Sequence, residues 1–346
     1  MRAVIFEGVG KVGLADVPEP EILDPGDAIV RVTCAGICGS DLHLVHGKAP
    51  MEAGQPLGHE AVGVVETVGS AVSRVRVGQR VAVAFNVACG HCWFCGHGQS
   101  GLCDEGAIFG YGVFGGALPG AQAERLRVPS ADVNLLPVPD GVADEAAVFV
   151  GDVLTTGFYG ASLADASAED VVAVLGCGPV GICTILGLRS LGAPAVYALD
   201  REPTRLTLAE RAGATAVHID ERNPATALAA ATDGRGADIV IDAVGHPAAF
   251  EDAGDVVRRG GTVVIVGVYA SETIELQLGA AWSRALTFRF AGLTPVLAWW
   301  DRAMAAVERG AADPTPIVSD RLRLEDAPDG YARFDRLEAT KVVLLP

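Results

Sequence analysis

Short apolar runs separated by turn residues make up the first part of the chain. The clearest runs occupy residues 28–34, 61–68 and 80–85, and clusters of Asp, Pro and Gly separate them. Apolar runs of this length between turn signals predict β-strands. Residues 1–150 are therefore predicted to be rich in short strands.

From about residue 153 to residue 290 the pattern changes to Val- and Ile-rich runs that alternate with segments of helical length. A helix, for example, is expected over 204–212. Such alternation predicts a parallel sheet that is covered by helices on both faces. The predicted strands occupy 171–176, 195–200, 216–220, 237–245 and 261–268.

The remaining segment contains an amphipathic helix around 299–309 and a closing strand, KVVLLP, at 341–346. No internal repeat interrupts this order. The pattern as a whole predicts an α/β protein in which a strand-rich part precedes a doubly wound parallel sheet.

Composition and charge narrow the classes of function. The formal net charge is −17 at pH 7 and no basic run stands out, which excludes nucleic acid as a partner. The sequence contains no stretch of about 18 uninterrupted apolar residues, so it predicts no membrane span. Arg2, Glu7, Lys11 and Asp16 lie where a signal peptide needs its apolar core, so we expect a cytoplasmic protein.

The eight cysteines point to metal or thiol chemistry, because no secretory signal favours disulfides. Cys89, Cys92, Cys95 and Cys103 fall within residues 89–103. Thiolates at this spacing can converge tetrahedrally on zinc, and four ligands leave no open position, so this site is predicted to be structural. An iron–sulfur cluster is the alternative, since two CxxC steps also occur in such proteins, although the fourth spacing does not fit them.

A glycine-rich turn, Gly176-Cys-Gly178-Pro-Val-Gly181, directly follows a predicted strand and opens a helix at Pro179 and Val180. In this setting the glycines permit a tight turn, close approach of a pyrophosphate and close packing of helix on strand. The pattern predicts a dinucleotide site.

Asp200 ends the next predicted strand, where an acidic side chain accepts hydrogen bonds from the ribose hydroxyls and repels a 2′-phosphate. NAD is therefore favoured over NADP. Arg201 and Arg205 lie nearby, and a guanidinium there can stack on adenine or bind a phosphate.

Several further motifs stand in a fixed order: GICGSDLH (36–43), PLGHE (56–60), the four-cysteine segment, GDVLTTG (151–157), the glycine turn and the final KVVL. In this order they resemble the zinc-containing alcohol dehydrogenases of the medium-chain dehydrogenase/reductase superfamily, nearly end to end. The resemblance implies a GroES-like catalytic domain of residues 1–152 and 291–346, with a Rossmann NAD-binding domain of residues 153–290 inserted between them.

The resemblance also assigns the catalytic zinc to Cys38, His59 and Asp152, with Glu60 beside them as an outer or exchangeable ligand. Aspartate at the third position is similar to the bacterial secondary-alcohol, threonine, polyol and formaldehyde dehydrogenases. Such a zinc activates an alcohol for hydride transfer to the nicotinamide. Two zinc ions per chain are expected.

The resemblance further implies a proton relay from Ser40 through the nicotinamide ribose to His43, a residue type suited to this task. His46, His91 and His97 are interpreted as ordinary surface residues. The cofactor contacts implied in the same way are Thr156, Val268, Leu293 within the backbone stretch 291–293, and Lys341.

Three functions are consistent with these patterns. The first is oxidation of a small primary or secondary alcohol, or the reverse reduction. The second is a specialised polyol, threonine or formaldehyde dehydrogenase, and the third a non-catalytic or zinc-free relative such as a quinone reductase. The pocket wall that we expect is mostly apolar, which disfavours polyols as substrates. Relatives of this length are commonly homo-oligomers, either tetramers or dimers, and we expect the same here. That wall is predicted to comprise Phe85, the region 109–114, Leu118, Val268 and Leu293.

Overall fold

The computed structural model describes residues 1–193, 195–270 and 273–346, and the chain divides into two compact units. One unit joins Met1–Thr155 to Leu293–Pro346, and the other is Thr156–Gly292. The sequence analysis placed the boundaries at 152/153 and 290/291. The predicted boundary 152/153 coincides with the start of helix α5, Val153–Ala164, whereas the observed division at 155/156 falls inside this helix.

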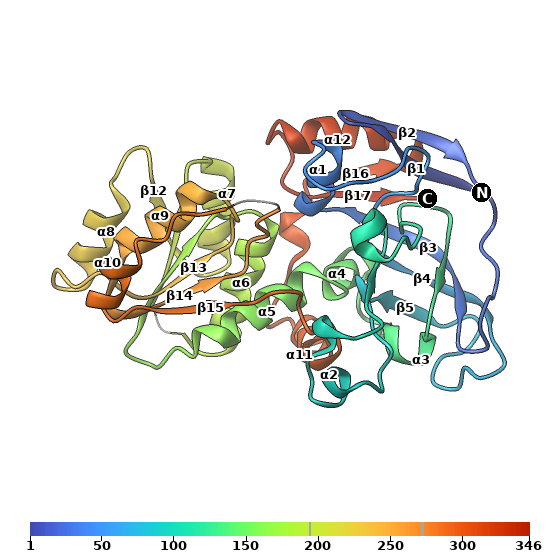
Figure 1. Cartoon of the computed structure of the whole chain (residues 1–346), viewed down its shortest axis with the longest axis horizontal. Helices are drawn as coiled ribbons and strands as arrows, with labels where there is room; N and C mark the ends of the chain where they lie inside the picture. Colours follow the sequence, from blue (N-terminus) through green and yellow to red (C-terminus); the bar gives the residue numbers. More distant parts are fainter. Residues whose placement is uncertain (194, 271–272) are drawn as a thin grey trace. The chain divides into compact units, whose positions relative to one another are not determined.

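The first unit is built on a seven-stranded sheet, drawn mainly in blue, green and red in Figure 1. Its long central strand is β3, Ala28–Ile37, which pairs with β4, Glu60–Val68, on one side and with β17, Val342–Leu345, on the other. The predicted strands at 28–34, 61–68 and 341–346 are therefore neighbours. The remaining members of the sheet are β5 Arg80–Val83, β8 Arg125–Val128, β9 Leu135–Pro137 and β16 Asp320–Arg323.

Smaller elements surround this sheet. Strand pairs and short helices account for most of the chain between the long strands, as the turn-rich sequence predicts. The strand pairs are β1 Arg2–Gly8 with β2 Lys11–Asp16, and β6 Asn86–Val87 with β7 Ala107–Ile108. The helices are α1 Gly39–Val45, α2 Trp93–Gly96, α3 Ala131–Asn134, α4 Asp144–Val150, α11 Val296–Glu308 and α12 Ala327–Asp335, with shorter turns η1 Ser100–Leu102, η2 Gly112–Gly115, η3 Thr315–Ile317 and η4 Leu324–Asp326.

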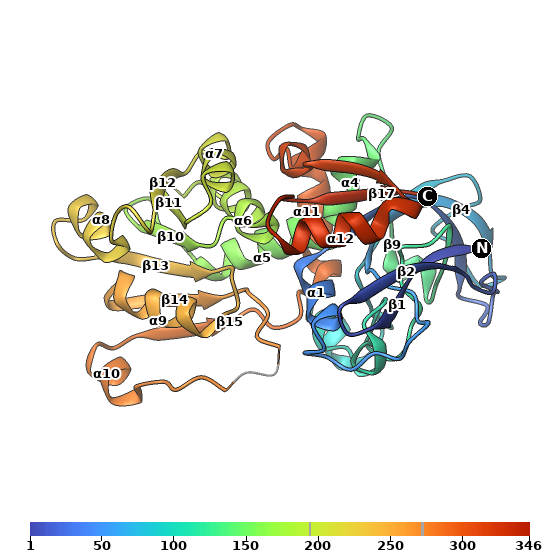
Figure 2. The ribbon, with the colours of Figure 1, turned by 90° about the horizontal axis from the view of Figure 1, so that it is seen from above.

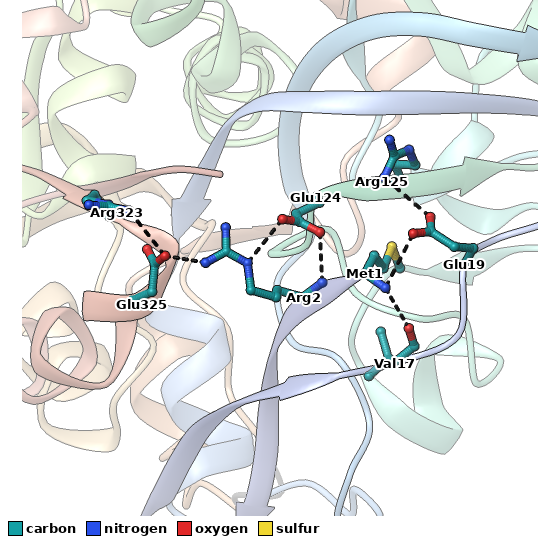
Figure 3. A network of polar contacts seen from close by, with 8 residues as sticks. All are labelled: Met1, Arg2, Val17, Glu19, Glu124, Arg125, Arg323 and Glu325. Carbon is teal, nitrogen blue, oxygen red and sulfur yellow. Dashed lines mark hydrogen bonds and ion pairs between the residues drawn. The ribbon is translucent and has the colours of Figure 1, made fainter.

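Polar contacts tie the two ends of the chain together within this unit (Figure 3). The Arg2 guanidinium bridges Glu124, with 3.1 Å between Nε and Oε1, and Glu325 on η4. The Met1 ammonium donates to the Val17 carbonyl at 2.9 Å and lies 3.4 Å from Glu19. Because these groups are partly exposed, each pair adds little stability alone. Their value is geometric: the Arg2–Glu325 pair holds the first strand against the C-terminal segment, and the Met1 contacts hold it to residues 17–19.

The second unit is a six-stranded parallel sheet in the order β12-β11-β10-β13-β14-β15. Its helices are arranged around this sheet (Figures 1 and 2), and α6 packs with α7 while α8 packs with α9. The predicted α/β fold with a doubly wound parallel sheet is confirmed. The strands are β10 Val171–Leu175, β11 Ala195–Asp200, β12 Thr215–His218, β13 Ala237–Asp242, β14 Val257–Ile265 and β15 Thr287–Phe290; the helices are α6 Pro179–Ser190, α7 Pro203–Arg211, α8 Pro224–Ala231, α9 Pro247–Val256 and α10 Leu278–Ser283.

Among the described residues, no single helix combines the length and apolar composition needed to cross a membrane, although the bent pair α4 and α5 does so jointly.

Candidate metal and cofactor sites

Four potential metal ligands meet inside the first unit: Cys38, His59, Glu60 and Asp152. All four are buried, and their ligand atoms lie within 4.8 Å of one another. The antiparallel register of β3 and β4, which places Gly36 opposite Glu60, brings Cys38 close to His59 and Glu60. Asp152 joins them from the turn between α4 and α5. The tertiary fold thus assembles the set that the resemblance implied.

The composition of this cluster fits a cation. Two carboxylates and a thiol are buried close together, an arrangement that costs free energy unless positive charge neutralises it. Within the described parts of the chain, Oε1 of Glu60 has no hydrogen-bond partner. Burial and the nearby Glu60 charge raise the pKa of the Cys38 thiol, so without a metal the thiol stays protonated. A zinc ion would remove these costs by binding the thiolate, an imidazole nitrogen and a carboxylate.

His59 is held between two carboxylates. Its Nε2 lies 3.1 Å from Oδ2 of Asp152 and its Nδ1 lies 3.0 Å from Oδ1 of Asp41, although the latter contact is bent away from ideal hydrogen-bond geometry. Burial lowers the pKa of His59, but these carboxylates outweigh it and raise the pKa well above its usual value. Without a metal the ring is therefore protonated, and a zinc ion between His59 and Asp152 would take the place of the proton on Nε2.

Ser40 and His43, the predicted relay residues, both lie on α1. The Ser40 hydroxyl is 3.3 Å from Nε2 of His59, so it borders the metal cluster. His43 is half-buried in the last turn of the helix, and burial together with the Lys48 charge lowers its pKa. His43 is therefore neutral and able to accept a proton at neutral pH.

Lys341 occupies a place that the sequence analysis did not anticipate. Its side chain is fully buried, its ammonium pairs with Oε2 of Glu60, and the same nitrogen lies 5.6 Å from the centre of the Phe149 ring. This placement gives no support to the predicted pyrophosphate contact, because the ammonium faces Glu60 inside the first unit. Gly36 makes room for the pair, since a Cβ there would lie 1.7 Å from Oε2 of Glu60.

Aromatic side chains adjoin the metal cluster. The rings of Phe85 and Tyr111 meet the His59 ring edge-on, with centroid distances of 6.0 and 6.5 Å. Burial raises the pKa of Tyr111 to about 12, so its hydroxyl stays neutral. Of the predicted pocket wall, Phe109 is wholly buried, whereas Phe114 is exposed.

The four cysteines of 89–103 converge as predicted, with sulfur atoms close enough to hold one ion. Backbone amides point at the sulfurs: those of Cys89 and Cys92 lie 3.3 Å from the sulfurs of Cys103 and Cys89. Hydrogen bonds from the backbone amides of Cys95 and Asp104 lower the pKa of Cys92 to about 6, because they stabilise its thiolate. A positive φ of 78° at Gly90 provides the turn between the first two ligands.

The three glycines of the predicted dinucleotide turn have three different surroundings. Gly176 has a φ of +84°, which a tight turn requires. A Cβ on Gly178 would meet nothing within 4 Å, so the space beside this residue is open. A Cβ on Gly181 would lie 1.8 Å from the Gly176 carbonyl oxygen, so only glycine allows helix α6 to pack here.

Asp200 ends β11 and is buried beside this turn. Its Oδ2 accepts a hydrogen bond from the Cys177 amide at 2.6 Å, and its Oδ1 accepts from the Arg201 and Glu202 amides at 2.7 and 2.9 Å. A carboxylate offers about four acceptor positions. Three are thus occupied, and one remains for a ribose hydroxyl.

The other predicted cofactor residues lie in or next to the second unit. Pro179 and Val180 form the first turn of α6, and Thr156 lies on α5. Several of the remainder have accessible side chains. These are Arg201, Arg205, Val268 and Leu293.

The sequence analysis missed three buried residues around His59: Asp41, Gln122 and Tyr331. Asp41 carried a usable signal, because it is the third residue of a helix that begins directly after Cys38, where an acidic side chain caps the first turn. No local pattern singles out Gln122 or Tyr331, which reach the site from distant parts of the chain.

Comparison with known proteins places these sites in a family. The sequence model of the alcohol dehydrogenase GroES-like domain matches residues 24–140, and that of the zinc-binding dehydrogenases matches residues 179–299. The zinc-type alcohol dehydrogenase-like protein AdhB of Bacillus subtilis (strain 168) is 38% identical, with 100% of each chain covered.

Solved structures agree with this placement. Alcohol dehydrogenase TADH from Thermus sp. ATN1 superposes with a TM-score of 0.94 and 43% identity, covering 100% of this chain and 99% of that one. A zinc-binding dehydrogenase from Sinorhizobium meliloti 1021, bound to NADP, gives a TM-score of 0.87 at 32% identity, covering 100% and 99%.

Proposed function

Because the chain belongs to the zinc-dependent alcohol dehydrogenase family of the medium-chain dehydrogenase/reductase superfamily and is a zinc-dependent oxidoreductase, we propose that it transfers a hydride between NAD and a small alcohol, aldehyde or ketone. The observation that carries this proposal is the buried convergence of Cys38, His59 and Asp152, with Glu60 beside them, so that their ligand atoms lie within 4.8 Å of one another.

Cys38, His59 and Asp152 would hold the catalytic zinc as three ligands, which leaves one position for the substrate oxygen. Glu60 is held back by its pairing with Lys341. When bound, the ion supplies Lewis-acid polarisation of the substrate oxygen and favours its deprotonated form. The four cysteines of 89–103 would hold a second, structural zinc.

The protein's own side chains carry the remaining steps. The Ser40 hydroxyl, 3.3 Å from Nε2 of His59, would accept the proton of the substrate hydroxyl and pass its own proton on through the ribose of the cofactor. His43, neutral at neutral pH, would take that proton towards solvent. Phe85 and Tyr111 would exclude water from the reacting carbon, because their rings adjoin His59.

The second unit would bind the nicotinamide cofactor at the glycine turn. The open space beside Gly178 and the start of α6 suit a pyrophosphate. The buried carboxylate of Asp200 favours NAD, since a 2′-phosphate would meet its negative charge. The accessible Arg201 and Arg205 would contact the adenosine portion.

We further propose that the protein is a homo-oligomer, a dimer or tetramer. Strand β15 ends the six-stranded sheet, and Phe290 on this strand and Trp282 on α10 have 71% and 82% of their surfaces exposed. Large exposed apolar side chains beside a sheet edge favour association. The thiolates of a four-cysteine zinc site must stay reduced, which suits a cytoplasmic location.

Two measurements test the function. Metal analysis is expected to find two zinc ions per chain, and a screen of NAD reduction with short alcohols, diols, polyols, threonine and formaldehyde identifies the substrate class. Asp152→Ala is expected to abolish turnover and to leave one zinc per chain, because the four-cysteine site keeps its own ligands. A variant with wild-type turnover would refute the ligand assignment.

A further inference from the structure

We propose that Gln122 and Tyr331 are positioning residues that act through Asp41 to orient the metal ligand His59. This inference rests on the proposed function only in that it takes His59 to bind the catalytic metal. It assigns a role in the metal site to helix α12, which is otherwise a packing element near the C-terminus.

Asp41 is the centre of the arrangement. It is fully buried, and its Oδ1 lies 3.0 Å from Nδ1 of His59. Its Oδ2 accepts hydrogen bonds from the Cys38 amide at 3.0 Å and from Nε2 of Gln122 at 3.3 Å. One carboxylate thus contacts the backbone of one metal ligand and the ring of another. Whatever fixes Asp41 also fixes these two ligands.

The Gln122 side chain is fixed by partners on both of its polar atoms. Its Nε2 also donates to the Gly36 carbonyl at 2.9 Å, and its Oε1 accepts a hydrogen bond from the Tyr331 hydroxyl at 2.9 Å. A carbonyl can only accept, so the amide nitrogen must face Gly36. Tyr331 then satisfies the opposite end. The amide therefore presents a donor, and not an acceptor, to Asp41.

The fold makes a specific space for this side chain. Gly58, directly before His59, has a φ of +88°, and a Cβ there would lie 2.3 Å from Cγ of Gln122. Tyr331 reaches Gln122 from α12 across 209 positions of sequence, and only 3% of its surface is exposed. Burial raises the pKa of Tyr331 well above its usual value, so the hydroxyl remains a donor at every relevant pH.

The consequence concerns the tautomer and the orientation of His59. A zinc-bound histidine needs a neutral ring with its proton on the nitrogen that faces away from the metal. The donors from Cys38 and Gln122 hold the Asp41 carboxylate 3.0 Å from Nδ1, and its negative charge there favours a proton on that atom. Nε2 is then left to face Asp152 and the metal position. Outer partners of this kind typically affect metal affinity 10- to 100-fold.

The test compares Tyr331→Phe, Gln122→Met and the double variant in the full-length protein. Phe334→Leu is the matched control, because it perturbs the buried face of the same helix without touching the chain of hydrogen bonds. Each protein is loaded with Co²⁺ in place of zinc, its d–d absorption spectrum is recorded, and zinc loss to a chelator is measured. The four-cysteine site contributes the same background to every variant.

We expect Tyr331→Phe and Gln122→Met to alter the d–d bands and to weaken zinc retention at the buried site about tenfold. The double variant should cost less than the sum of the two, since both act through Asp41. Phe334→Leu should change neither readout, even if it lowers the melting temperature.

Unchanged spectra and zinc retention in both single variants would overturn the inference. A wild-type protein that shows no Co²⁺ signal beyond that of the four-cysteine site would instead refute the proposed catalytic metal site, so the two failures are distinguishable. Changes of equal size in Phe334→Leu would reduce the effect to general packing and would also overturn the positioning role.

Discussion

The buried pair of Lys341 and Glu60 makes a sharp prediction about stability. Lys341→Met keeps the length and apolar body of the side chain and removes only its charge. Glu60 is then left buried beside Asp152 with no cationic partner except the metal. Breaking a buried ion pair in this way typically costs about 3–5 kcal/mol. We expect the lower end, about 3 kcal/mol, because a bound zinc ion supplies part of the missing positive charge.

The cost should depend on pH, with a sign that the structure determines. Burial raises the pKa of Glu60, and Lys341 is the main group that lowers it, so the variant raises this pKa further. An acid whose folded-state pKa exceeds its unfolded value stabilises the fold most at low pH and loses that contribution as pH rises through the folded pKa. The variant should therefore be most destabilised near pH 8 and should recover towards pH 5.

Thermal unfolding of the zinc-loaded protein measures both effects. For a unit of about 200 residues, a loss of 3 kcal/mol corresponds to a fall of about 6–12 °C in Tm. The double variant Glu60→Gln/Lys341→Met removes both charges and should regain most of this loss. Arg336→Met, which breaks an exposed pair with Glu338, is the control and should leave Tm nearly unchanged.

The reasoning fails if the double variant is no more stable than Lys341→Met. The Glu60 charge would then not be the source of the cost. It also fails if the loss in Tm is the same at pH 5 and pH 8.

Further predictions concern the cofactor turn and the proton relay. Gly181→Ala should destabilise the second unit and abolish NAD binding, since its Cβ would lie 1.8 Å from the Gly176 oxygen. Gly178→Ala should fold normally and weaken only NAD binding, because a Cβ there meets nothing within 4 Å. Calorimetry measures the NAD binding of each variant, and thermal unfolding measures its stability. Asp200→Ala should reduce both NAD affinity and stability, because three backbone amides lose their acceptor. Steady-state kinetics should show a lower preference for NAD over NADP. Higher NADP use with no loss in NAD use would contradict this role of Asp200. Lys48→Met should raise the pKa of His43, because the Lys48 charge is, after burial, a cause of its lowered value. The acidic limb of the pH profile of kcat/KM should therefore shift to higher pH. An unshifted limb would argue against His43 as the base.

The sequence alone determined the strands, the class of fold and two of the three sites to a large extent. Apolar runs at 28–34, 171–176 and 195–200 became β3, β10 and β11, because strand formation depends on local composition and on flanking turns. The cysteine segment and the glycine turn each act within one short stretch of chain. Their spacing therefore carried most of their geometry.

The cluster of Cys38, His59 and Asp152 depended on the tertiary structure. Spacing could not connect Cys38, His59 and Asp152, and only the resemblance to a family did so. The structure shows why they meet: the pairing of β3 with β4 brings Cys38 close to His59, and the turn between α4 and α5 adds Asp152. Register between strands is set by side chains on facing elements, which no single stretch of sequence contains.

Tertiary structure alone also decided the partners of these ligands. The resemblance implied that Lys341 contacts the cofactor, yet Lys341 directly precedes β17, which pairs with β3, and is buried against Glu60. No local pattern singled out Gln122 or Tyr331, and only the fold joins Gln122 to Asp41 and Tyr331 to Gln122. A buried polar group must find its partner wherever the chain provides one, so its identity depends on contacts across hundreds of residues and not on local pattern.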